Sequence, residues 1–182
     1  MGRGSALYVR DTIMSAEVQN SEICEAAVWS EIKLRNHDKL IIGVVYRSPS
    51  STVAQNDTFV SMIANIVNMK ASHLMIMGDF NYPGIDWIMQ TSTGAAQEDF
   101  FLEGFRDWFL WQHSNKPTHY RAQQTANILD LVFTNKEGMI ENLQYEEPIG
   151  SSHHLTMNWI CNCTLNEYKL KQSSIHMTRQ IL

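Results

Sequence analysis

The chain has 182 residues, the size of one domain or of one domain with a tail. Its 14 Lys and Arg against 19 Asp and Glu give a net charge of −5, which excludes a protein that coats nucleic acid through bulk positive charge. The 44% hydrophobic content argues against disorder, and no apolar stretch approaches the roughly 20 residues of a transmembrane helix.

The first half of the chain alternates strand and helix patterns. Apolar residues predict strands at 6–9, 28–34 and 40–46, and the last (ending LIIGVVY) suits a central strand buried on both faces. A loop with proline and several serines follows. A helix capped by Asn56 or Asp57 comes next and ends near Lys70, because its apolar residues recur at helical spacing.

The second half adds one helix and four strands. Strand patterns cover 74–77, 128–133, 139–145 and 155–161, and a long loop is expected at 78–94. Several phenylalanines and Trp108 predict a helix over 98–109 that packs into the core. The interleaved elements indicate a layered α/β or α+β domain over 1–163, and the polar residues 164–182 form a tail or linker.

The cysteines and the start of the chain indicate the compartment. Cys24, Cys161 and Cys163 are too few for a disulfide framework, and the lone Cys-x-Cys lacks the second pair of a zinc site. The sequence MGRGS lacks a secretory signal pattern. We expect reduced thiols in or near a strand, in an intracellular protein that is nuclear or cytoplasmic.

Two polar side chains follow the strand at 74–77. Asp79 and Asn81 are two residues apart, so in an extended chain both point to one side and could hold a water molecule or a phosphate oxygen. The alternative is an Asx turn that only closes the strand.

Asp130 is a charge inside the apolar run ILDLVF. A buried carboxylate needs a partner, and histidine is an economical one; His153 and His154 stand directly before the last strand. The alternatives are an exposed Asp130 on an edge strand and histidines that are plain loop residues. Tyr46 ends its strand, where its hydroxyl could reach a phosphate or its ring could simply pack.

These strand ends together suit metal-assisted phosphodiester hydrolysis. Mg²⁺ prefers oxygen ligands, and a general acid or base with hydrogen-bond donors to the phosphate would supply the rest.

Four blocks of the sequence resemble the endonuclease/exonuclease/phosphatase family, and more narrowly the apurinic-type endonuclease domain of non-LTR (LINE-like) retrotransposons. The blocks are VYRSP from Val45, MGDFNYPGIDW from Met77, LDLVFT from Leu129 and GSSHH from Gly150. Their order and spacing match, and GDFNYPGIDW is the most specific of them.

The resemblance implies a four-layer α/β sandwich of two mixed sheets packed face to face with helices outside, here lacking its first strands. It implies that Asp79 handles a proton at the attacking water or the leaving oxygen, and that Asn81 and Tyr46 contact the phosphate. His154 would act as a base or phosphate ligand, oriented by Asp130. The family nicks DNA with Mg²⁺, for which Mn²⁺ could substitute, and in retrotransposons the domain precedes a reverse transcriptase.

Three departures from the family pattern bear on activity. The family's principal metal-binding Glu has no match in this sequence. His153 stands where the family has an acid of the metal site, and imidazole is a poorer Mg²⁺ ligand than carboxylate. His119 stands where relatives often have an arginine.

We therefore expect a metal-dependent, DNA-nicking endonuclease domain whose activity in this chain is weak or absent. The alternative is a catalytically dead remnant that at most binds nucleic acid. A phosphatase or lipid phosphodiesterase of the same fold is less favoured, because the VYRSP and GDFNYPGIDW blocks are retrotransposon-like.

Overall fold

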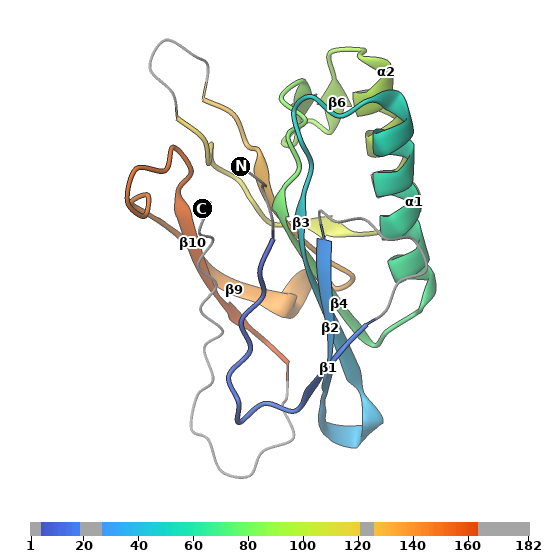
Figure 1. Ribbon diagram of the computed structural model, residues 1–182, viewed down its shortest axis with the longest axis vertical. Helices are drawn as coiled ribbons and strands as arrows, with labels where there is room; N and C mark the ends of the chain where they lie inside the picture. Colours follow the sequence, from blue (N-terminus) through green and yellow to red (C-terminus); the bar gives the residue numbers. More distant parts are fainter. Residues whose placement is uncertain (1–4, 19–26, 121–125, 164–182) are drawn as a thin grey trace.

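A six-stranded mixed sheet forms the centre of the computed structural model, which describes residues 5–18, 27–120 and 126–163 (Figure 1). In spatial order its strands are β1 (Ser15–Glu17), β2 (Ala27–Lys33), β3 (Lys39–Tyr46), β4 (His73–Asp79), β8 (Asp130–Thr134) and β7 (Trp111–Gln112). β3 and β4 are parallel, and every other pair is antiparallel. The expected tail 164–182 and Cys24 lie outside the described residues.

Two helices cover one face of this sheet (Figure 1). α1 (Val53–Asn68) joins β3 to β4, since parallel neighbours need a crossover connection, and α2 (Ala96–Asp107) lies beside it. The core between helices and sheet is rich in aromatic rings, among them Phe59, Phe80, Phe101, Phe105 and Phe133. Phe80 lies edge-on to Phe133, with ring centroids 4.9 Å apart, a favourable aromatic geometry.

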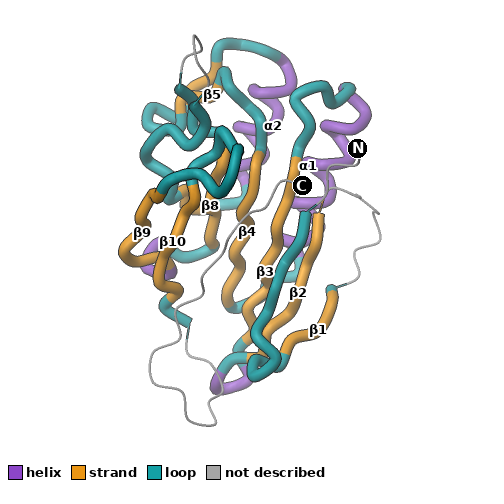
Figure 2. Tube along the Cα trace, turned by 60° about the vertical axis from the view of Figure 1, so that its left-hand side comes forward, coloured by secondary structure: helices purple, strands orange, loops and turns teal. Residues whose placement is uncertain are grey.

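A second, antiparallel sheet packs on the opposite face. It consists of β9 (Ile140–Glu146) and β10 (Thr156–Cys161), seen beside β8 in Figure 2. A separate core of Ile42, Met75, Met77, Val132 and Trp159 lies between the two sheets. The described residues thus form three layers, helices, sheet and sheet, which confirms the expected α/β sandwich; a fourth layer of helices over β9 and β10 is not among them.

The N-terminal part of the fold differs from the expectation. Residues 6–9 form no strand; instead Leu7 and Val9 pack against the core between the sheets without pairing. β1 pairs with β2 but is exposed along its whole length, so no apolar pattern predicts it. The expected strand at 6–9 is therefore wrong, because apolar side chains alone do not require backbone pairing.

α1 begins earlier than expected. Its N-cap is Thr52, whose hydroxyl accepts a hydrogen bond from the Gln55 N–H while the Gln55 side chain accepts one from the Thr52 N–H. Asn56, expected as a cap, lies inside the helix and is buried. The expected cap at Asn56 or Asp57 is wrong, because the capping box starts the helix one turn before the apolar pattern.

The expected loop at 78–94 is partly ordered into strands. β4 continues through Asp79, and a small hairpin follows, formed by β5 (Ile85–Asp86) and β6 (Thr91–Ser92). In α2, Phe101 and Phe105 are buried as expected, but Phe100 and the following Phe109 are exposed. No helix in the described ranges has the length and apolar character needed to cross a membrane.

Candidate active site

Three polar side chains lie in one row across the end of the main sheet. Tyr46 at the end of β3 is the register partner of Asp79 on parallel β4, and Asp79 is the register partner of Asp130 on antiparallel β8. Register partners point to the same face of a sheet, and here that face is the one covered by β9 and β10. The pairing therefore brings the two carboxylates together where the sheets meet.

His154 lies between these two carboxylates. Its Nδ1 is 2.7 Å from Asp130 Oδ2, and its Nε2 is 3.9 Å from Asp79 Oδ2. Both aspartates are buried, at 2% and 3% exposure, and the His154 side chain is 15% exposed. The expected pairing of Asp130 with histidine is confirmed, and the alternative of an exposed Asp130 on an edge strand is wrong.

This arrangement favours one tautomer of the neutral imidazole. A carboxylate accepts hydrogen bonds when ionised, so the neutral ring donates its Nδ1 proton to Asp130. Nε2 is then the basic atom, on the side of Asp79. A general base held by one carboxylate and facing a second is an arrangement that can move a proton to or from a water molecule.

Thr118 joins the start of β8, which carries Asp130, to the segment before β10, which carries His154. Its buried hydroxyl accepts hydrogen bonds from the Leu129 and Asp130 N–H groups, at 3.2 and 2.9 Å. Its carbonyl oxygen accepts one from the Leu155 N–H at 2.8 Å. Sequence reasoning did not assign Thr118 a role, and the only signal was its place in the block Pro117-Thr118-His119.

Two further imidazoles lie beside His154. The His119 ring centroid is 4.7 Å from that of His154 and 6.4 Å from that of His153. His153 is exposed, and its carbonyl accepts a hydrogen bond from the Tyr120 N–H. The two histidines that are expected to depart from the resembled pattern therefore border the site.

Asn81 is held by the loop that follows β3. Its φ of 49° shows that the chain does not stay extended after Asp79, and its Nδ2 donates to the Arg47 carbonyl oxygen at 2.8 Å. Arg47 Nη1 donates in return to the Asn81 carbonyl oxygen at 2.8 Å, and the Arg47 N–H donates to the Asp79 carbonyl oxygen at 2.8 Å. These bonds join the ends of β3 and β4.

Buried Arg47 is the centre of this connection, and sequence reasoning missed it. Its Nε donates to Asn56 Oδ1 and its Nη2 to Gln97 Oε1, at 3.1 and 2.7 Å. Its guanidinium lies 4.1 Å from the Tyr82 ring centroid, and burial raises the pKa of the Tyr82 hydroxyl against the opposing effect of this positive charge. The signal in the sequence was the arginine in VYRSP, which requires a partner if it is buried.

The described residues offer one group of side chains with the spacing of a metal site. Ligand atoms of Asp79, Asp130 and His154 lie within 4.8 Å of one another. Two carboxylates and an imidazole are a donor set that suits a divalent cation, and the carboxylate oxygens are the ligands that Mg²⁺ and Mn²⁺ prefer. The residues present therefore fit the expected cation.

A family model described as "Endonuclease-reverse transcriptase" matches residues 40–157. The match includes Tyr46, Asp79, Asn81, Asp130 and His154. The chain belongs to this endonuclease/exonuclease/phosphatase-type family, which supports an enzyme of the nuclease or phosphodiesterase class. No curated protein matches the chain significantly.

A solved structure with a TM-score above 0.5 shows the same fold. The endonuclease domain of TRAS1, a telomere-specific non-LTR retrotransposon, is similar with a TM-score of 0.66 and 13% identity, over 92% of this chain and 80% of that one. The 3′ phosphatase NExo from Neisseria has a TM-score of 0.49 and 10% identity, over 72% and 62% of the two chains. The APE2 catalytic domain from Xenopus laevis has 0.49 and 13%, over 80% and 58%.

Proposed function

We propose that this chain is a metal-dependent phosphodiester hydrolase that nicks DNA, as the endonuclease domain of a retrotransposon-type protein that also carries a reverse transcriptase. The observation that supports this most is the contact of His154 with Asp130 and its approach to Asp79 in a chain of this family. An oriented imidazole beside a second carboxylate suits proton transfer at a phosphodiester.

Each side chain of the site has a proposed role. Asp130 orients His154, and the Nε2 of His154 acts on the phosphate or on the attacking water. Asp79 handles a proton at that water or at the leaving oxygen. Asn81 and Tyr46 contact the phosphate, one from the turn after β4 and the other from the end of β3.

A divalent cation, Mg²⁺ or Mn²⁺, would be held by the Asp79 and Asp130 carboxylates, while His154 keeps its role in proton transfer. When bound, it would supply positive charge to the phosphate oxygens. The net charge of −5 makes this contribution important, because the protein as a whole repels DNA.

Two departures from the family pattern are the reason for proposing weak activity in this chain: the metal-binding Glu has no match in the sequence, and His153 replaces an acid. The exposed imidazole stands where the family has an acid, so a negative charge is lost beside the proposed cation site. The same substitution favours the second candidate, a catalytically dead remnant that binds nucleic acid. The two candidates differ in whether the remaining three groups still support turnover.

A nicking assay with supercoiled plasmid and the full chain distinguishes the weak nuclease from the catalytically dead remnant. We expect slow conversion to open circles with Mg²⁺ or Mn²⁺, loss of that conversion with EDTA, and loss in the His154→Ala variant. We also expect His153→Asp to increase the rate by roughly tenfold or more, as restoration of a metal-site carboxylate should.

Absence of nicking by both the wild-type chain and His153→Asp would contradict the nuclease proposal. Retained binding of a short DNA duplex in that case would favour the remnant. Equal nicking by His154→Ala and the wild-type chain would show that the cleavage does not come from this site.

A further inference from the structure

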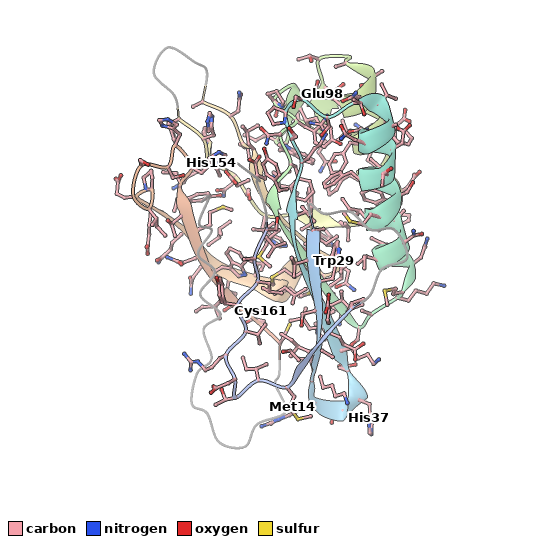
Figure 3. The ribbon with its side chains drawn as sticks, viewed as in Figure 1. Met14, Trp29, His37, Glu98, His154 and Cys161 are labelled. Atoms are coloured by element: carbon pink, nitrogen blue, oxygen red, sulfur yellow. The ribbon has the colours of Figure 1, made fainter. Side chains whose placement is uncertain are left out.

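The Cys161 and Cys163 thiols form a close pair at the end of β10. Their Sγ atoms are 3.1 Å apart, with Cys161 donating to Cys163. Figure 3 shows Cys161 and His154 toward opposite ends of β10, so the pair is separate from the candidate active site.

The backbone holds the two thiols on one side. Asn162, between them, donates from its N–H to the Met139 carbonyl oxygen at 2.9 Å and from its Nδ2 to the Gly138 carbonyl oxygen at 3.1 Å. These bonds fix the middle residue against the turn before β9. The sulfur atoms of a disulfide lie about 2.0 Å apart, so the two Sγ atoms are only about 1 Å beyond bonding distance.

The two cysteines differ in environment. Cys161 is buried at 8% exposure in the core between the sheets, and Cys163 is partly exposed. The hydrogen bond from Cys161 lowers the pKa of the Cys163 thiol, with a further contribution from the positive charge of Lys136, and the same contact and burial raise the pKa of Cys161. The accessible sulfur is thus the better nucleophile, and its neighbour is a protected thiol within reach.

We propose that Cys161 and Cys163 are a thiol–disulfide exchange site that low-molecular-weight disulfides oxidise to an intramolecular disulfide. This site is independent of the proposed nuclease activity. It explains why two thiols with different accessibility are held in contact by an anchored residue between them.

The reaction proceeds in two steps. The Cys163 thiolate attacks one sulfur of the small disulfide, whose S–S bond breaks, and the first small thiolate leaves and takes up a proton. Cys161 then loses its proton, and its sulfur attacks the Cys163 sulfur of the mixed disulfide and displaces the second small thiolate, which is protonated in turn. The protein loses two electrons and two protons, and the small disulfide is reduced to two thiols.

Oxidised glutathione is the probe for the test, with the full chain in a Cys24→Ser background so that only this pair can react. After incubation, the intact mass of the protein should be lower by two hydrogens, with no glutathione attached. Iodoacetamide should alkylate neither Cys161 nor Cys163. The Cys161→Ser variant in the same background should instead retain one glutathione on Cys163. Lys136→Gln should slow alkylation of Cys163 at neutral pH, because it removes a positive charge that lowers the pKa of that thiol.

Two results would overturn the proposal. One is a chain with Cys161 and Cys163 in which both thiols remain open to alkylation after incubation. The other is a stable glutathione adduct on Cys163 in that same chain, because it would show that Cys161 does not reach the mixed disulfide. Both are read on the chain that keeps the two cysteines, so folding of the variants does not decide the outcome.

Discussion

Thr118 accepts hydrogen bonds that connect the start of β8 to the residue after His154. Its hydroxyl accepts two buried backbone N–H groups at the start of β8, and its carbonyl accepts the Leu155 N–H next to His154. Two donors would lose their acceptor if the hydroxyl were removed, and an unsatisfied buried donor costs more than an average hydrogen bond contributes.

Thr118→Val tests this role because it keeps the shape and removes the acceptor. We expect a loss of about 1–3 kcal/mol in the free energy of unfolding, measured by urea denaturation. Thr58→Val is the matched control: the Thr58 hydroxyl is exposed on α1, so a change within about 0.5 kcal/mol is expected. Similar losses in both variants would contradict the proposed role of Thr118.

Individual site residues could be predicted only where the type of residue did not suit its neighbours in the sequence. Asp130 is a charge in an apolar strand, and that conflict indicated both its burial and its partner His154. Asn81 conflicts with nothing nearby, so its left-handed backbone and its bond to Arg47 could not be predicted. These depend on how two distant loops meet.

At the scale of elements, β3 and β4 can lie close together at the site because residue 78 is a glycine. Its φ is 143°, and a Cβ there would lie 1.9 Å from the Val45 carbonyl oxygen. Backbone atoms cannot move aside as a flexible side chain does. A glycine directly before Asp79 is therefore required for the two strand ends to approach.

Gly78→Ala should destabilise the protein by about 3 kcal/mol or more, through the close contact and the strained backbone together. Gly138→Ala is the control, because a Cβ at Gly138 meets no atom within 4 Å. Thermal unfolding followed by circular dichroism measures both variants. An unchanged midpoint for Gly78→Ala would show that β3 and β4 do not approach as closely as described.

The positions of helices and strands could be predicted where their apolar patterns were long. The residues at which these elements begin and end could not. The apolar patterns located β3, α1 and β10. The start of α1 depended on Thr52 and Gln55, whose capping box precedes the apolar positions. β1 has no buried face, so the apolar pattern of the sequence does not indicate that it pairs with β2.

At the scale of the whole molecule, two partly buried histidines make the fold sensitive to acid. Burial lowers the pKa of His113 and of His73 below the ordinary 6.5, and the charge of Lys136 adds to the effect at His73. Each unfolded histidine binds a proton more readily than the folded one, so stability falls as the pH drops below about 6.5.

We expect a lower urea midpoint at pH 5.5 than at pH 7.5, and a smaller difference in the His113→Gln variant. Glutamine does not titrate and can still donate to the Thr134 hydroxyl, which lies 2.7 Å from His113 Nε2. The exposed His37, replaced by Asn, should leave the difference unchanged. An equal pH difference in the wild-type chain and His113→Gln would rule out this cause.

The layered fold was predictable from the sequence because family-specific blocks fall at the ends of its strands. That these strand ends lie together could not be predicted from the sequence. It depends on β8 running antiparallel to β4, which places Asp130 at the start of its strand rather than at a carboxyl end. Only this reversal makes Asp79 and Asp130 direct neighbours, with His154 between them.

The most direct test of this account is the plasmid-nicking rate of Asp130→Asn against the wild-type chain, each also in the His153→Asp background. If Asp130 orients His154 for cleavage, the rate should fall by about 10²–10⁴-fold, while circular dichroism shows an intact fold. Equal rates, or no cleavage even with His153→Asp, would contradict the assignment of Asp79, His154 and Asp130 as a nuclease site.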